Sequence, residues 1–305
     1  MNRAGVIGLG DMGSGLAKNL IQQKFETTGF DLDQKRMEAF AAMGGDPAKD
    51  AAQVGQNADT VFLMVMTGGQ AKSVLFGDGN NGLVSKMISG STVILTATIK
   101  PSEAREIGEL MQGTGVNLID SPVSGGFLGA QGGTLTMMAA GRPDVMAACE
   151  RVMQAVSSTI HHVGVEVGMG QTVKACLQTL IGSIFSATFE ASVLAAKAGI
   201  SGEVLYKVFS TSGAGCGVMS TALENIIDRK FEKTGSHIAT MHKDLTISLA
   251  LAEELGVPMN MASTAMQLFH AGKTKYPGGD NWVVTRVIEE IVGAELHRKN
   301  FGEIS

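Results

Sequence analysis

The stretch Gly8-Leu9-Gly10-Asp11-Met12-Gly13 decides the fold of this chain. It follows a short apolar run at 4–8 and precedes a helical pattern at 14–24. In a strand–turn–helix unit, the first glycine allows the tight turn, the second lets the backbone approach a pyrophosphate, and the third lets helix and strand pack closely. The free N–H groups at the helix N-terminus then face the phosphates. These six residues therefore predict a dinucleotide site, and the alternative is an ordinary glycine turn.

An acidic residue strengthens this interpretation. In dinucleotide-binding domains it is expected about 20 residues further on, at the end of the second strand. Asp31 stands there, in Gly29-Phe30-Asp31. A carboxylate at this place accepts hydrogen bonds from ribose hydroxyls and repels a 2′-phosphate. We therefore predict NAD as the cofactor, with NADP as the alternative.

The first half of the chain alternates short strand-like runs with helical stretches. The run at 60–66 is apolar throughout, as in a parallel strand buried on both faces, and we expect Met64 and Val65 at its end to contact the cofactor. Further strands are expected at 27–31, 91–96, 117–119, 134–139 and 159–163, with a helix at 34–43. Repeated strand–helix alternation predicts an α/β doubly wound sheet of the Rossmann type.

The pattern changes after about Gly164. One long helical stretch at 171–198 is followed by further helical segments with almost no strand signal. We therefore predict a Rossmann domain at 1–165 and an all-helical substrate and oligomerisation domain at 166–305. The stretch 175–199 is apolar nearly all round, but Gln178, Glu190 and Lys197 make it too polar for a lipid-facing span. It is better explained as a helix in a protein core.

Charge and composition exclude several classes of partner. The formal net charge is −5 and no long basic run occurs, which argues against nucleic acid or an anionic membrane as the main partner. The three cysteines have no metal-ligand spacing, and we predict no metal site. The N-terminus enters a strand at once, which leaves no room for a signal peptide, so we expect a cytoplasmic protein.

Four motifs in order, of which the glycine turn is the first, carry a family resemblance. They are the opening GLGDMGSGLAKNL from Gly8, the segment Asp120-Ser121-Pro122-Val123-Ser124-Gly125-Gly126, Gly168-Met169-Gly170 followed by Lys174, and Lys243-Asp244-Leu245. With them the sequence resembles the β-hydroxyacid dehydrogenase family over nearly its whole length. Within this family it is most similar to the branch that acts on threonate. The resemblance implies a contact of Thr98 and Lys243 with the cofactor.

Two motifs also have a physical rationale of their own. Ser124-Gly125-Gly126 exposes backbone N–H groups beside a hydroxyl, which suits a carboxylate, although an isolated turn of this kind is more often a plain turn. Lys174 lies in an apolar helix, where burial would lower its pKa and let it exchange a proton near neutral pH; a lysine whose stem covers apolar surface is the alternative. Gln178, four residues later, shares its face.

The resemblance implies a hydride transfer between NAD and the hydroxyl-bearing carbon of a small 3-hydroxy carboxylic acid of three or four carbons. Ser124, Gly125 and Gly126 would anchor the carboxylate, Lys174 would act as general acid/base, and Gln178 would orient the reacting oxygen. The alternatives are an NADPH-dependent reductase of small aldehydes or imines, and a catalytically silent dinucleotide-binding module. We also expect a homodimer or homotetramer. The sequence departs from the family at Leu95-Thr96-Ala97-Thr98, which lacks the usual acidic residue, and at Leu177, and both leave the substrate open.

Overall fold

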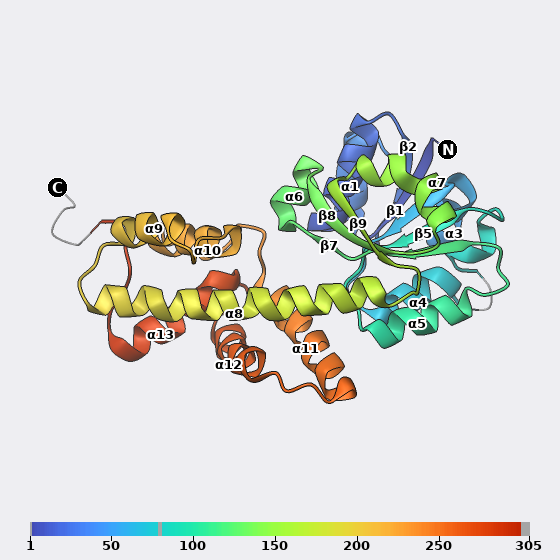
Figure 1. Cartoon of the computed structure of the whole chain (residues 1–305). Coiled ribbons are helices and arrows are strands. Elements are labelled where there is room, and N and C mark those ends of the chain that lie inside the picture. Colours follow the sequence, from blue (N-terminus) through green and yellow to red (C-terminus); the bar gives the residue numbers. More distant parts are fainter. Residues whose placement is uncertain (1, 79–80, 300–305) are drawn as a thin grey trace. The chain divides into compact units, whose positions relative to one another are not determined.

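The computed structural model describes residues 2–78 and 81–299. The chain divides into two compact units, Met1–Lys174 and Ala175–Ser305, which we call the first and the second unit. Figure 1 shows the sheet of the first unit and the helices of the second. The predicted functional division at residue 165 stays a prediction.

The first unit is built on one sheet whose strands follow the order β3-β2-β1-β4-β5-β6-β8-β7, with β9 beside β8. The six strands from β3 to β6 are parallel, in the order 3-2-1-4-5-6 that is typical of doubly wound dinucleotide-binding folds. The strands are β1 Arg3–Ile7, β2 Glu26–Phe30, β3 Asp46–Pro47, β4 Thr60–Leu63, β5 Thr92–Leu95, β6 Asn117–Asp120, β7 Val123–Ser124, β8 Leu135–Ala140 and β9 Ser157–Gly164.

Helices cover both faces of this sheet (Figure 1). Alternate residues of each central strand enter opposite cores: Phe62 packs with helices α1, α2 and α7, whereas Val61 and Leu63 pack with α3, α4 and α5. The fold class predicted from strand–helix alternation is therefore confirmed. The helices are α1 Asp11–Gln22, α2 Gln34–Ala42, α3 Ala51–Asn57, α4 Gly68–Phe76, η1 Leu83–Lys86, α5 Pro101–Leu110, α6 Gly126–Gly132 and α7 Pro143–Gln154.

Within the described residues, the regular elements of the second unit are helices, and one isolated β-bridge joins His237 and Asp280. Its core gathers around Phe185 and Phe189 of α8, whose rings stack at 5.9 Å, and around Phe269 and Trp282. The elements are α8 Met169–Lys197, which begins in the first unit, α9 Gly202–Thr211, α10 Gly217–Ile227, α11 Ile238–Leu255, α12 Asn260–Lys275, η2 Asn281–Val283 and α13 Val284–Val292.

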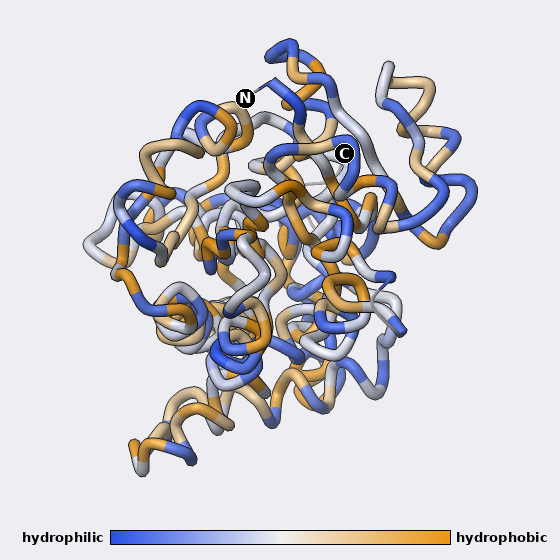
Figure 2. Tube along the Cα trace, turned by 90° about the vertical axis from the view of Figure 1, so that its right-hand side faces the viewer, coloured by the Kyte–Doolittle hydropathy of each residue, from blue (hydrophilic) through white to orange (hydrophobic). Residues whose placement is uncertain are grey.

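Helix α8 is long and apolar enough to cross a membrane by length and composition, a test that the core helices of soluble proteins also pass. Its two phenylalanines are buried in the core of the second unit, as predicted for a core helix. Hydrophobic stretches are interrupted by hydrophilic ones along the trace (Figure 2).

The structure differs from the sequence prediction in two short strands and in the ends of two predicted elements. The strand predicted at 60–66 ends at Leu63, and the carbonyl of Met64 beyond it lies against Gly8. Strands β3 and β7 have two residues each and carry no periodic signal, so the sequence did not indicate them. The long helix begins at Met169, two residues before the predicted start.

Helices α1 and α6 touch through their backbones. A Cβ at Gly15 would lie 2.6 Å from the carbonyl oxygen of Ala130, so only glycine allows this approach. The side chain of Asn19 seals the contact, since its Nδ2 donates to the carbonyl oxygens of Gly15 at 2.7 Å and of Ala130 at 2.8 Å. The helix of the glycine turn and the helix that follows Ser124-Gly125-Gly126 are thereby fixed to each other.

This contact predicts the effect of adding one methyl group. We expect Gly15→Ala to lower the free energy of unfolding of the first unit by roughly 1–3 kcal/mol, because the added carbon must push two backbones apart. The measurement is urea unfolding of the whole chain, for the variant and for the wild type. Gly69→Ala is the matched control, since Gly69 is also near the start of a helix, but its added carbon would meet only the Thr67 hydroxyl, at 3.9 Å. An equal effect of the two substitutions would contradict the close-approach argument.

Candidate functional site

The glycine turn lies at the carboxyl end of β1 and leads into α1. Gly8 has a φ of +89°, and a Cβ on it would lie 2.1 Å from the carbonyl oxygen of Met64. A Cβ on Gly13 would lie 1.7 Å from the carbonyl oxygen of Gly8, so the turn and the first helical turn are packed backbone to backbone. The atoms nearest to a Cβ built on Gly10 are those of the Arg36 guanidinium, at 3.7–3.9 Å. The backbone at Gly10 is therefore bordered by the end of a half-exposed side chain and not by backbone, and no side chain caps α1 there.

Asp31 is held rigidly at the end of β2. One carboxylate oxygen accepts the N–H of Leu9 at 2.7 Å, and the other accepts the N–H of Asp33 at 2.9 Å. The half-exposed guanidinium of Arg36 lies 3.3 Å from the same carboxylate. The structure thus joins Leu9 and Asp31, which the sequence predicted separately as cofactor contacts, and adds Arg36, which it did not predict.

The remaining predicted cofactor contacts of the first unit lie along the same edge of the sheet. Met64 and Val65 follow β4, and the carbonyl of Met64 lies against Gly8. Thr98 follows β5 and is half-buried, between two fully buried neighbours. Because the carboxyl ends of parallel strands meet at one edge, these segments come together where doubly wound sheets bind ligands.

The predicted carboxylate turn begins in strand β7 and ends in α6. Gly125 and Gly126 have φ angles of +127° and +59°, a backbone that residues with a side chain rarely adopt. Both glycines are exposed, and a Cβ on Gly126 would meet nothing within 4 Å. Open space therefore adjoins Gly126, whereas Ser124 pairs with Thr136 of β8, and α6 ties this turn to the helix of the dinucleotide turn.

Lys174 lies near the start of α8, with its side chain buried. The start of this helix is bound by Asp120, at the end of β6. One oxygen of the fully buried Asp120 carboxylate accepts the N–H of Gly168 at 2.8 Å and of Gln171 at 3.2 Å. Burial raises the pKa of Asp120 to about 6, and the hydrogen bonds from Gln171 and Gly168 oppose that rise.

The two predicted residues of the second unit are joined by a third. Gln178 of α8 donates from Nε2 to Asp244 Oδ2 at 2.6 Å, and Lys243 Nζ lies 3.0 Å from Asp244 Oδ1. Gln178 and Asp244 are buried, and the side chain of Lys243 is one-quarter exposed. One carboxylate thus holds the amide of Gln178 and the ammonium of Lys243 in place.

The structure therefore adds Arg36, Asp120, Gln171 and Asp244 to the predicted residues. Asp120 and Asp244 belong to motifs described in the sequence analysis. Asp120 is the first residue of its segment, and Asp244 is the second residue of Lys243-Asp244-Leu245. A polar residue in an otherwise buried run is the available signal, because burial of a charge requires partners. Arg36 and Gln171 carry no such signal in a single sequence.

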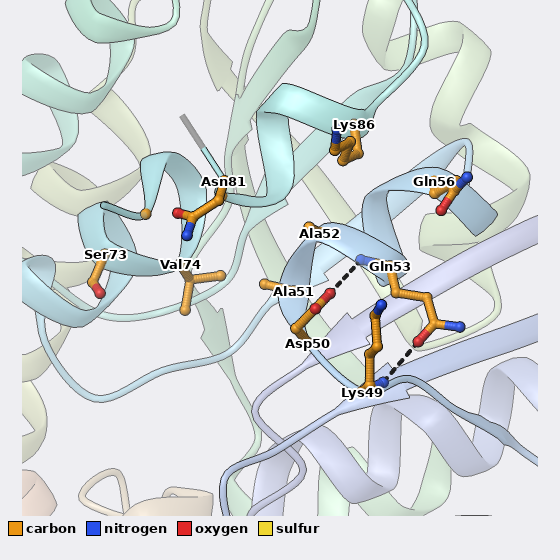
Figure 3. Close-up of a pocket in the computed structure, with 12 residues that line it drawn as sticks. Lys49, Asp50, Ala51, Ala52, Gln53, Gln56, Ser73, Val74, Asn81 and Lys86 are labelled. Atoms are coloured by element: carbon orange, nitrogen blue, oxygen red, sulfur yellow. Dashed lines mark hydrogen bonds between the residues drawn. The ribbon is translucent and has the colours of Figure 1, made fainter. Parts of the chain in front are cut away.

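Two other features stand apart from these residues. His162 of β9 contacts the carbonyl oxygen of Gly141 at 2.8 Å, and no metal-binding group of His, Cys, Asp or Glu occurs within residues 2–78 and 81–299. A hollow between α3, α4 and η1 is lined by polar side chains, among them Lys49, Gln53 and Lys86 (Figure 3). None of the predicted site residues lines it.

Two family models cover most of the chain. Residues 3–164 match the NAD binding domain of 6-phosphogluconate dehydrogenase, and residues 168–288 match the NAD-binding domain of NADP-dependent 3-hydroxyisobutyrate dehydrogenase.

Individual proteins match over nearly their full length. L-threonate dehydrogenase of Cupriavidus necator is 32% identical over 97% of this chain and 98% of its own. The 3-hydroxyisobutyrate dehydrogenase of Pseudomonas aeruginosa is 31% identical over 86% and 89%, respectively. Among solved structures, a 3-hydroxyisobutyrate dehydrogenase from Salmonella typhimurium is 29% identical, with a TM-score of 0.85 over 94% of this chain and all of that chain.

The raised pKa of Asp120 predicts how stability depends on pH. An unfolded Asp loses its proton near pH 4, whereas the folded one keeps it to about pH 6. The folded state therefore binds more protons between these values, so the free energy of unfolding falls as pH rises from 4 to 6, by roughly 3 kcal/mol, and stays lower above pH 6. The measurement is urea unfolding from pH 4 to 7, for the wild type and for Asp120→Asn, which has no proton to lose. A stability difference between the two that is constant over this range would contradict the prediction.

Proposed function

Since the chain belongs to the β-hydroxyacid dehydrogenase family of NAD(P)-dependent enzymes, we propose that it oxidises the hydroxyl-bearing carbon of a small threonate-like hydroxy acid, with NAD as the hydride acceptor. The observation that carries this proposal is the docking of α6 on α1 through Gly15 and Asn19. It fixes the turn suited to a carboxylate against the turn suited to a pyrophosphate.

The residues present fit a dinucleotide. The glycine turn leaves open backbone above Gly10, where a side chain would obstruct a pyrophosphate. Asp31 lies at the end of β2 with its carboxylate held by two backbone N–H groups. When bound, the nicotinamide supplies the chemistry of hydride acceptance, and the protein supplies placement and proton transfer.

Each predicted residue of the chain then has a role. The N–H groups of Gly125 and Gly126 and the hydroxyl of Ser124 bind the substrate carboxylate, which fixes the carbon that reacts. The buried Lys174 accepts the hydroxyl proton at Nζ as the carbon–hydrogen bond breaks. Thr98 contacts the cofactor beside β5. In the second unit, Gln178 orients the reacting oxygen and Lys243 contacts the cofactor, and Asp244 holds both side chains.

We further propose that the protein is cytoplasmic and forms a homodimer or homotetramer, with no nucleic acid or membrane as partner. The net charge of −5 supports the absence of a polyanionic partner. Exposed apolar side chains on the helices of the second unit support association with further copies of this chain, and include Leu180, Leu194, Val204, Val208, Met261 and Ile291.

The function is tested by NAD reduction over a panel of three- and four-carbon acids: threonate, erythronate, glycerate, 3-hydroxyisobutyrate, serine and threonine. We expect turnover with at least one of them, and we expect Lys174→Ala to lower kcat by a factor on the order of 100 to 10,000, as loss of a general base does. The affinity for NAD, measured by fluorescence titration, should stay within about threefold, because the glycine turn is untouched.

The exposed Lys207→Ala, in α9, is the matched control and should keep full activity. A Lys174→Ala enzyme that retains most of its kcat would remove Lys174 from the mechanism. A wild type that is silent with every acid and NAD, but reduces an aldehyde or imine with NADPH, would replace the proposed reaction by the reductase.

The contact between Asp31 and Arg36 predicts how cofactor preference changes. We expect Asp31→Ser to raise kcat/KM with NADP by about tenfold or more and to lower it with NAD, because Arg36 loses its carboxylate partner and can pair with a 2′-phosphate. The double variant Asp31→Ser/Arg36→Ala should lose the gain with NADP. Steady-state kinetics with both cofactors measure this, and an equal gain in the two variants would show that Arg36 has no part in it.

A further inference from the structure

Gln171 occupies a buried position one helical turn before Lys174. Its side chain makes three hydrogen bonds inside the first unit. Oε1 accepts the N–H of Ile99 at 3.0 Å, and Nε2 donates to the carbonyl oxygen of Ala97 at 3.0 Å and to Asp120 Oδ1 at 2.8 Å. The residue is 1% exposed, so no water competes for these bonds.

These partners fix the orientation of the amide. Oε1 faces an N–H group, and both partners of Nε2 are acceptors, a carbonyl and a carboxylate. If the amide were flipped, its NH2 group would face the N–H of Ile99, and its oxygen would face the two acceptors, the Ala97 carbonyl and the Asp120 carboxylate. Two polar groups of the loop and one carboxylate therefore specify a single rotamer of one side chain.

The two backbone partners flank Thr98. Ala97 and Ile99 are buried, whereas Thr98 between them is half-exposed. The amide of Gln171 thus binds the loop on both sides of Thr98, the least buried of these three residues. Its third bond reaches Asp120, whose other oxygen binds the first N–H groups of α8.

We propose that Gln171 is a positioning residue that sets the distance between the Thr98 loop and Lys174. Its backbone belongs to the helix of Lys174, and its side chain clamps the loop that contacts the cofactor. This inference rests on the proposed function, since it assigns a part in the hydride and proton transfer of that site. Gln171 touches neither substrate nor cofactor in this scheme and acts through Thr98 and Lys174.

The opposite face of α8 offers no comparable group. Val173 and Cys176 are exposed, and Thr172 bonds only back to its own helix, at the carbonyl oxygen of Gly168. A Leu at position 171 would have about the right volume but no polar atom, which leaves the Ile99 N–H, the Ala97 carbonyl and one Asp120 oxygen without this partner. The loss of these hydrogen bonds would therefore destabilise both the loop at 97–99 and the N-terminal end of α8.

The experiment compares three variants with the wild type. Gln171→Leu removes all three bonds, and Gln171→Glu keeps the shape but turns an acceptor towards Ala97 and Asp120. Gln171→Glu/Asp120→Asn restores a donor–acceptor pair with reversed polarity between positions 171 and 120. The exposed Gln154→Leu, on α7, is the matched control. The readouts are kcat, the Kd of NAD, and hydrogen–deuterium exchange of the segment 97–99.

We expect Gln171→Leu and Gln171→Glu to lower kcat on the order of 100-fold, as a misplacement of about 1 Å does, with the Kd of NAD within about threefold. Exchange at 97–99 should rise in both. The double variant should recover about tenfold of the kcat lost in Gln171→Glu, and Gln154→Leu should match the wild type. A merely structural glutamine would lower kcat only in proportion to the folded fraction, which circular dichroism measures.

Either of two results overturns the proposal. One is a fully folded Gln171→Leu whose kcat stays within about threefold of the wild type, and the other is unchanged exchange at 97–99. A wild type that oxidises none of the acids would instead overturn the proposed function. The exchange measurement, which needs no turnover, then decides alone whether Gln171 clamps the loop.

Discussion

A buried carboxylate at the end of β6 is the constraint around which the start of α8 and the loop after β5 are arranged. Asp120 has no exposed surface, and ionising it there costs free energy, which its raised pKa records. It offsets that cost by accepting N–H groups from the first turn of α8, which would otherwise be unsatisfied. The helix that carries Lys174 therefore begins where the carboxylate requires it to begin.

The second constraint is steric and concerns glycine. Gly170 lets α8 approach the strand ends, since a Cβ would lie 2.5 Å from the carbonyl oxygen of Asp120. Gly15 plays the same part between α1 and α6, and Gly13 between α1 and the turn before it. At each of these contacts two backbones touch directly, with no side chain between them. The distance between these elements is therefore set by van der Waals contact of their backbones rather than by side-chain rotamers.

The sequence predicted the parts of the fold that have a local signal. The strand–turn–helix of Gly8 to Gly13, the apolar strands and the long helix have patterns that can be read within a dozen residues. The partners of Gln171 lie 51, 72 and 74 residues away along the chain, and those of Asn19 as far as 112. No periodicity encodes such a pairing. Arg36 was missed for another reason, because an Arg on a helix surface is usually solvated, and only the fold brings it to Asp31.

The proposed arrangement is compatible with different acids. Relatives of this chain at 28–32% identity carry the names of dehydrogenases for L-threonate, 2-(hydroxymethyl)glutarate and 3-hydroxyisobutyrate. These acids share a carboxylate and a hydroxyl and differ in the rest. In the proposed function the carboxylate is bound by Gly125 and Gly126 and the hydroxyl by the buried Lys174, and backbone contacts and a buried network hold these residues. A side chain outside these contacts can change without moving them, so substrate choice can evolve while the geometry of hydride and proton transfer is retained.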